Sequence, residues 1–144
     1  MRYKAIPLAL LLVPAMACGF NDDGSSTSAT VRVGEAVALA VGQTALVEET
    51  GITITFVAVL SDSRCPSDAV CILLGDAKMR LRADVSGVPA AQADVGLFDH
   101  TSLTYQGLEF TVENLDPWPK STDGTPPQSS YRATIRARAV LSNH

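Results

Sequence analysis

The sequence contains little of what catalytic, metal-binding or nucleic-acid-binding proteins usually need. Its 144 residues include two histidines, three cysteines and one tryptophan, and fifteen acidic residues outnumber eleven basic ones. The acidic balance argues against nucleic acid, and against a generally anionic membrane surface, because both attract basic proteins. With so few histidines and cysteines, the chain also has few candidate ligands for a zinc site.

Long apolar runs are absent, and the most extended one lies near the start of the chain. Arg2 and Lys4 precede an apolar run over residues 6–13, and this run is too short to span a bilayer. Small residues follow at 14–17, so the order of charge, apolar run and small residues predicts an export signal over residues 1–17. Loss of Arg2 and Lys4 with the signal leaves nine basic against fifteen acidic residues, a formal net charge of −6.

Cys18 directly follows the expected cleavage point and precedes a polar stretch. This arrangement resembles bacterial lipoproteins, in which that cysteine becomes the lipid-bearing first residue and the polar stretch is a tether. The resemblance implies a lipid on Cys18, a tether over 18–29 and a place in the cell envelope, on the outer membrane if the organism has one. The segment 15–17 also fits ordinary secretory cleavage, so a secreted soluble protein is the alternative.

The remaining chain, residues 30–144, has the length of one domain. Apolar and polar residues alternate over 51–60, 78–85, 107–113 and 131–140, and weaker strand patterns occupy 30–33, 36–41, 44–48 and 97–105. This two-residue period is typical of half-buried strands, and no segment of the body has a sustained helical period. We therefore predict an all-β fold, a single antiparallel β-sandwich or flattened barrel behind the signal peptide and tether.

The alternation also predicts which side chains face the core. They are Ile52, Ile54, Phe56, Met79, Leu81, Ala83, Val85, Leu108, Phe110, Val112, Tyr131, Ala133, Ile135, Ala137 and Ala139. If 107–113 and 131–140 form a hairpin, Glu109 and Glu113 share the outer face with three arginines, which are Arg132, Arg136 and Arg138. We expect cross-strand ion pairs worth a few tenths of a kcal/mol each. A solvated face of mixed charge is favoured over a surface for an anionic partner.

Cys65 and Cys71 are the two cysteines left after lipidation of Cys18, and an oxidising compartment favours their disulfide. Pro66 and the residues after it supply the turn that brings the two cysteines together. A loop this short gains about 2 kcal/mol from the cross-link. A zinc site would need two more ligands, and thioredoxin-like chemistry would need Cys-x-x-Cys, which is absent.

The cysteine loop carries a family resemblance. The run Asp-Ser-Arg-Cys-Pro at 62–66, then Cys71, then Gly-Asp-Ala at 75–77, resembles the signature of uncharacterised bacterial envelope lipoproteins. The segment 116–119, Asp-Pro-Trp-Pro, is similar to a Pro-Tyr-Pro stretch of that group. Leu73 and Leu74 depart from it, because Trp-Ala is usual at these positions. The resemblance implies a small β domain on a lipid anchor and brings no activity or catalytic residue.

Within this loop, four charged residues are the candidates for an interaction site: Asp62, Arg64, Asp68 and Asp76. The favoured interpretation is structural, in which Asp62 and Arg64 pair across a disulfide-clipped turn. Calcium binding by the three aspartates is an alternative, although no EF-hand pattern supports it.

The favoured function is a non-enzymatic binding or structural module of the cell envelope, with an envelope protein or a glycan as partner. No catalytic residue, cofactor or metal is expected, because Asp99 and His100 lack a placed nucleophile. The alternative is a protease inhibitor that presents the clipped loop flanked by Arg64, since a preorganised loop loses less entropy on binding.

Overall fold

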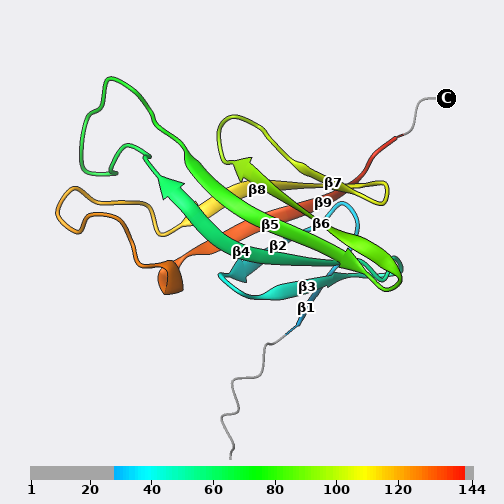
Figure 1. The fold of residues 1–144 in the computed structure, drawn as a ribbon. Coiled ribbons are helices and arrows are strands. Elements are labelled where there is room, and N and C mark those ends of the chain that lie inside the picture. Colours follow the sequence, from blue (N-terminus) through cyan, green and yellow to red (C-terminus); the bar gives the residue numbers. More distant parts are fainter. Residues whose placement is uncertain (1–27, 142–144) are drawn as a thin grey trace, which may run out of the picture.

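The computed structural model describes residues 28–141, which form two packed β-sheets (Figure 1). The predicted β-sandwich is confirmed. The strands are β1 (Ala29–Val31), β2 (Ala36–Ala40), β3 (Thr44–Val47), β4 (Thr53–Asp62), β5 (Ala77–Val85), β6 (Val88–Gly96), β7 (Leu103–Tyr105), β8 (Leu108–Asp116) and β9 (Arg132–Ala139), with one 3-10 turn, η1 (Gln128–Ser130). The expected signal peptide and Cys18 lie outside the described residues.

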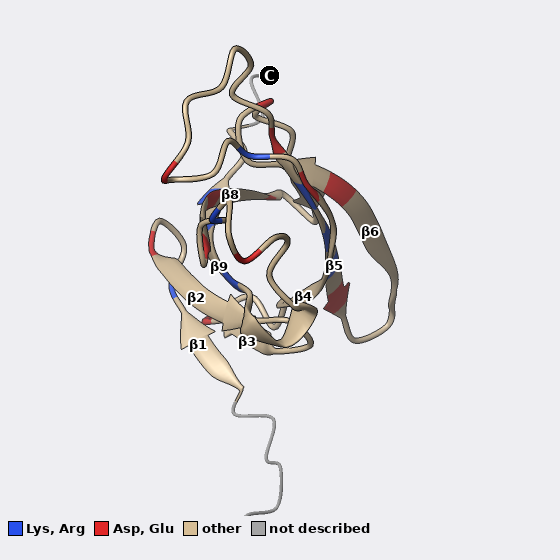
Figure 2. Cartoon of the chain, turned by 90° about the vertical axis from the view of Figure 1, so that its left-hand side faces the viewer, with Lys and Arg blue, Asp and Glu red and all other residues tan. Residues whose placement is uncertain are grey.

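One sheet has the order β1-β3-β4-β5-β6 and the other has the order β2-β9-β8-β7. Figure 2 shows the two sheets facing each other, with β4, β5 and β6 opposite β8 and β9. Neighbouring strands are antiparallel except for β1 and β3, which are parallel. The two sheets bury their inner faces against each other, as expected for a sandwich.

The core consists largely of the side chains that the alternation predicts. Phe56, Phe110 and Tyr131 are among the largest fully buried ones, and Ile54, Met79, Leu81 and Ile135 pack with them. Two of the predicted inward residues differ: Val85 is only half-buried and Ala139 is exposed. Both lie at the last position of their strand, where the sandwich no longer covers the inner face.

The strand β6 is absent from the prediction, and the strand expected over 97–105 shortens to β7. None of residues 88–94 is buried, and only two alanines, Ala91 and Ala93, mark the inner face there, which makes a weak alternation. The strand forms because it adds to the edge of the sheet beside β5, and Pro89 is tolerated there because an edge strand leaves part of its backbone unpaired.

The hairpin of β8 and β9 forms as predicted, with Glu109 opposite Arg138. Glu113 binds Arg136 and lies 3.7 Å from Arg138, so the expected cross-strand ion pairs are present there. Glu109 instead accepts a hydrogen bond from Ser102 at 2.8 Å. The arginine face is therefore partly neutralised within the sheet.

Two long loops lie together at one end of the sandwich (Figure 1). Residues 63–76 connect β4 with β5, and residues 117–131 connect β8 with β9. We call the first the disulfide loop and the second the proline loop. Within residues 28–141, no helix has the length and apolar character needed to cross a membrane.

Candidate interaction site at the disulfide loop

The base of the disulfide loop continues the pairing of β4 and β5. The Ser63 amide donates to the Asp76 carbonyl at 2.8 Å, and the Cys65 amide donates to the Leu74 carbonyl at 3.0 Å. Gly75 makes this closure possible, because it has φ +67° and an added Cβ would lie 1.7 Å from the Ser63 carbonyl oxygen. The chain therefore doubles back with its two sides in direct contact.

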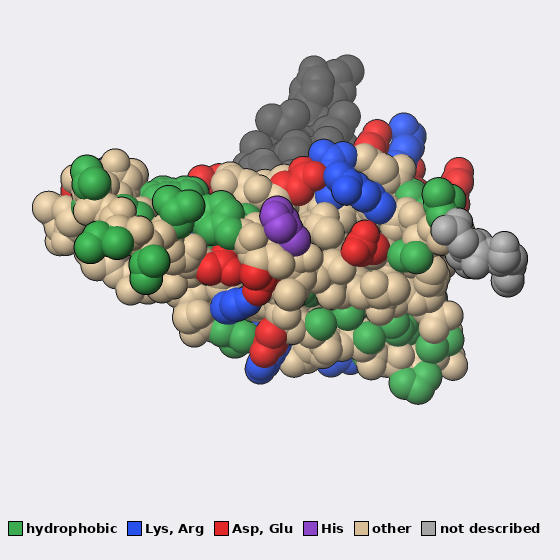
Figure 3. Space-filling view, turned by 90° about the horizontal axis from the view of Figure 1, so that it is seen from above, with side chains coloured by type: hydrophobic (Ala, Val, Ile, Leu, Met, Phe, Trp, Pro, Cys, Tyr) green, Lys and Arg blue, Asp and Glu red, His purple; other side chains and the backbone are tan. Residues whose placement is uncertain are grey.

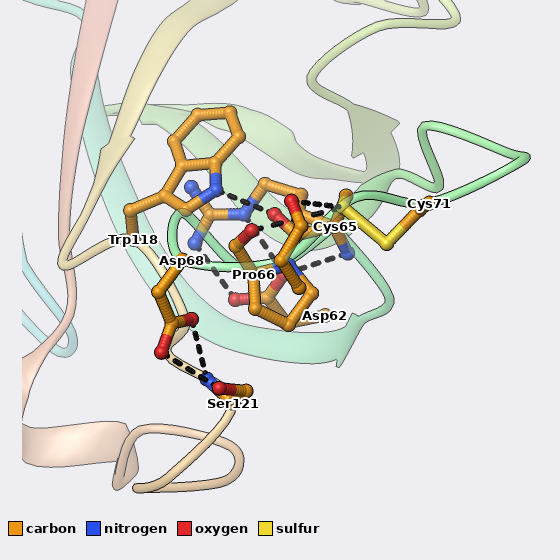
Figure 4. Close-up of a disulfide and its surroundings, with 9 residues drawn as sticks. Asp62, Cys65, Pro66, Asp68, Cys71, Trp118 and Ser121 are labelled. Carbon is orange, nitrogen blue, oxygen red and sulfur yellow. Dashed lines mark hydrogen bonds and ion pairs between the residues drawn. A yellow bond between two sulfur atoms is a disulfide. The ribbon is translucent and has the colours of Figure 1, made fainter.

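Cys65 and Cys71 form a disulfide, as the sequence predicts, with their Cα atoms 5.9 Å apart. Figure 4 places this bond beside Trp118 and Pro66. The cross-link closes the outer part of the loop, whereas the backbone hydrogen bonds of the base close the inner part. The loop is thus fixed twice along its length.

Beneath the loop, Arg64 and Asp62 form a buried ion pair. Arg64 Nε lies 2.8 Å from Asp62 Oδ1, and Nη2 lies 2.7 Å from Oδ2. Both side chains are 0% exposed. Two parallel bonds between a guanidinium and a carboxylate give the strongest geometry for such a pair, and removing one partner leaves an uncompensated buried charge.

Arg64 also fastens the disulfide loop to the end of β8. Its Nη1 donates to the Leu115 carbonyl at 2.6 Å and its Nη2 to the Pro117 carbonyl at 2.9 Å. Trp118 covers the guanidinium, with Cζ 4.6 Å from the ring centroid. The Trp118 indole N–H donates to the Cys65 carbonyl at 2.7 Å (Figure 4). Residues more than fifty positions apart are therefore joined around one cation.

Tyr131 also contacts the ion pair, because its hydroxyl donates to Asp62 Oδ2 at 2.8 Å. We call Asp62, Arg64, Trp118 and Tyr131 the Arg64 cluster. Burial acts to raise the pKa of Asp62, but the hydrogen bonds from Arg64 and Tyr131, together with the charge of Arg64, outweigh it and lower that pKa. Burial and the hydrogen bond to Asp62 raise the pKa of Tyr131. The cluster therefore favours an ionised carboxylate and a neutral phenol.

The proline loop is fastened to the disulfide loop and to β4. Asp68 accepts hydrogen bonds from the Ser121 amide at 2.8 Å and the Ser121 hydroxyl at 2.6 Å (Figure 4). These two bonds lower the pKa of Asp68. The Gln128 side chain donates to the Val59 carbonyl at 2.6 Å and accepts from the Val59 amide at 2.9 Å. These hydrogen bonds join the disulfide loop and the proline loop into one unit, which we call the lobe.

Asp76 caps a different segment. Its Oδ1 accepts from the backbone amides of Ala77, Leu97 and Phe98 at 2.7, 3.1 and 2.9 Å. Asp62, Asp68 and Asp76 therefore serve three separate purposes and do not converge on a common point. Across residues 28–141, no three His, Cys, Asp or Glu side chains gather where they could hold a metal ion. The calcium alternative has no site in this part of the chain.

Asp62, Arg64 and Asp68 thus hold the lobe together, and Asp76 ties the end of the disulfide loop to the segment after β6. The large hydrophobic side chains of the disulfide loop are exposed, and we call them the apolar tip: Val70, Ile72, Leu73 and Leu74. Sequence analysis missed the tip as a surface. Residues 70–74 contain four aliphatic side chains and no charge, which marks an apolar segment but does not show that it is exposed.

Elsewhere, Asp99 and His100 lie in the turn before β7, and Asp99 accepts hydrogen bonds from Thr101 and Lys78. His100 lines a shallow, open depression of about 370 Å³ beside Glu113 and Arg138. No serine, cysteine or threonine side chain makes a hydrogen bond to His100 in the described chain.

No protein-family model, no curated protein and no solved structure matches this chain.

Proposed function

We propose that this protein is a lipid-anchored binding module of the bacterial cell envelope, without enzymatic activity, whose disulfide loop carries the contact surface. The observation that supports a binding role most directly is the apolar tip, whose four side chains are at least 80% exposed. Contiguous exposed apolar side chains of this kind mark interaction sites in soluble domains.

The rigidity of the lobe supports the same function. Backbone pairing at the base, the disulfide, the Arg64 cluster and the Asp68–Ser121 contact all fix the loop in one arrangement. A contact surface that is ordered before binding loses less conformational entropy when its partner arrives. A tip of this kind on a mobile loop would bind more weakly.

Two measurements test this proposal. Intact mass spectrometry of membrane-extracted protein is expected to find a chain that begins at Cys18 and carries lipid; an unmodified soluble chain would refute the anchor. A photoreactive leucine analogue at position 73 is expected to form cross-links in the native envelope, whereas the same analogue at Leu141, which is 85% exposed, is not. Equal cross-linking at both positions would refute the contact surface.

The protease-inhibitor alternative keeps one specific observation in its favour, the disulfide-clipped exposed loop. The residue that it first invoked does not serve, because the Arg64 side chain is 0% exposed. The remaining candidates for a protease pocket are the leucines of the tip, so a protease with an apolar specificity pocket is the target to assay. Absence of inhibition would reject this alternative, and inhibition that survives Leu73→Asp with Leu74→Asp would reject the two leucines as its contact residues.

A further inference from the structure

The apolar tip is the most exposed aliphatic surface of the described chain. Val70 and Ile72 are fully exposed, at 103% and 102%, and Leu73 and Leu74 are 81% and 80% exposed. Figure 3 shows hydrophobic side chains gathered on the lobe at one end of the molecule. Leaving four such side chains in water loses the free energy that their burial would give.

Two aromatic side chains lie at the base of this tip. Trp118 is 38% exposed and Phe98 is 45% exposed, and their ring centroids are 6.2 Å apart. Trp118 binds the Cys65 carbonyl, and Cys65 in turn pairs with Leu74 of the tip. Trp118 therefore lies beside the aliphatic tip on the lobe, and Phe98 contacts Trp118 from the adjoining turn between β6 and β7.

Charge is absent from the tip itself. Residues 69–75 contain no ionisable side chain. The nearest carboxylates are engaged at the base, Asp68 by Ser121 and Asp76 by backbone amides. Acidic residues outnumber lysines in the disulfide loop, the proline loop and the turn at Asp99. This end of the sandwich therefore does not attract an anionic surface.

We propose that the apolar tip inserts into the interfacial region of a zwitterionic lipid bilayer. This inference rests on the proposed function only in that the lipid anchor would bring the domain to a membrane. The tip itself is formed by the folded domain and does not depend on the anchor. A bilayer interface accepts aliphatic side chains below and tryptophan at the headgroup level, which is the order of side chains along this lobe.

A protein partner fits the same surface less well. A stable protein interface buries about 800 Å² on each side and needs a complementary shape. The tip is a narrow projection of four side chains, and the adjoining proline loop is polar and exposed over most of residues 120–130. A bilayer needs no complementary pocket, so it can bury the tip without contact to the polar loop.

The expected tether allows this contact. Residues 18–28 span up to roughly 36 Å when extended. Ala29 pairs with Ala45, and Ala45 pairs with Ile54 of β4, from which the strand runs on to Asp62 at the loop. The distance along the strand from Ile54 to Asp62 is about 26 Å, and the three further residues to Cys65, which pairs with Leu74 of the tip, add about 10 Å, so the sum is about the length of the extended tether. A lipid on Cys18 would therefore hold the tip within reach of the same bilayer and raise its effective concentration there.

Trp118 provides the test, because it is the single tryptophan of the chain and lies at the base of the tip. The mature chain from residue 18 is prepared with Cys18→Ser, so that no lipid contributes. It contains the whole sandwich. With phosphatidylcholine vesicles, we expect the Trp118 emission to shift to shorter wavelength and to be quenched by brominated phosphatidylcholine.

The variant Leu73→Asp with Leu74→Asp is expected to weaken vesicle binding about tenfold or more. The control is Leu141→Asp, because Leu141 is equally exposed and lies beyond β9, at the other end of the sandwich. It should bind vesicles like the parent chain. Circular dichroism checks that each variant is folded. Replacing part of the phosphatidylcholine with phosphatidylglycerol should not strengthen binding.

Three results would overturn the bilayer assignment: no change in Trp118 emission with vesicles, an unchanged response in the double variant, or an equal loss in the control. If vesicles give no response while the photoreactive residue at position 73 cross-links to an envelope protein, the bilayer assignment fails and the proposed binding function stands. Absence of both signals refutes both. Lipid adducts at position 73 support the insertion directly.

Discussion

Arg64 and Asp62 form a two-bond ion pair with both side chains fully removed from solvent, two residues apart in the chain. Both residues of the pair make further hydrogen bonds. Arg64 carries two further bonds to carbonyl oxygens at the end of β8, and Asp62 accepts the hydroxyl of Tyr131. This one contact therefore joins the end of β4, the end of β8 and the start of β9.

The first prediction concerns the loss of this cation. Arg64→Leu leaves the Asp62 carboxylate buried without its partner, so we expect the free energy of unfolding to fall by about 3–5 kcal/mol. The exposed pair of Arg80 and Asp94 is the matched control, and Arg80→Gln should lower the free energy of unfolding much less, because solvent screens this pair. Urea unfolding measures both. Equal effects of the two substitutions would contradict the role assigned to Arg64.

The pH dependence of stability follows from the same cluster. The pKa of Asp62 is lower in the folded protein than its usual 3.8, so the stability it contributes is present above about pH 4 and is lost as the pH falls through the folded pKa. The pKa of Tyr131 is raised above 10, so its contribution is present below pH 10 and is lost as the pH rises.

We therefore expect Tyr131→Phe to flatten the loss of stability above pH 10 and to lower stability at neutral pH by about 1 kcal/mol through the lost hydrogen bond. Urea midpoints measured from pH 3 to pH 11 give both effects. Carbon NMR of the Asp62 carboxyl group should give a titration midpoint below 3.8. A midpoint above that value would contradict the assigned hydrogen bonds.

The third prediction concerns the disulfide. Replacing Cys65 and Cys71 with serine is expected to lower stability by about 2 kcal/mol, which is smaller than the roughly 5–15 kcal/mol typical of a folded domain. The sandwich should remain folded, because the Arg64 cluster and the Asp68–Ser121 contact still hold the lobe. Circular dichroism melting and a thiol assay of the native protein provide the measurement. Complete unfolding of the double variant, or Cys65 and Cys71 found as free thiols in the protein isolated from its native source, would contradict it.

The fourth prediction separates backbone conformation from crowding at two glycines. Gly75 and Gly87 both have positive φ, at +67° and +80°. A Cβ on Gly87 meets nothing within 4 Å, whereas a Cβ on Gly75 would collide with the Ser63 carbonyl. Gly87→Ala should therefore cost about 1–2 kcal/mol, from backbone strain alone. Gly75→Ala should cost clearly more and should increase amide exchange in the disulfide loop. Equal costs would mean that the close approach at Ser63 is unimportant.

Most strands of this fold can be predicted from the local pattern of apolar and polar residues in the sequence. The alternation around Ile54, Leu81, Phe110 and Ile135 predicts their strands, because burial on one face of a strand repeats every two residues and needs no knowledge of the partner strand. Neither β6 nor the shortened β7 could be predicted in this way. The first is an edge strand with little burial, and the second depends on the turn at Asp99.

For the candidate site, the sequence by itself determined the disulfide and the pairing of Asp62 with Arg64, because both join residues that lie close together in the chain. Only the tertiary structure decided that this pair is buried. Leu115, Pro117 and Trp118 reach Arg64 across more than fifty residues, since the sandwich brings the ends of β4 and β8 together. The same packing holds the base of the disulfide loop with polar contacts and leaves its aliphatic tip in solvent, and no local pattern distinguishes such a tip from a short buried segment.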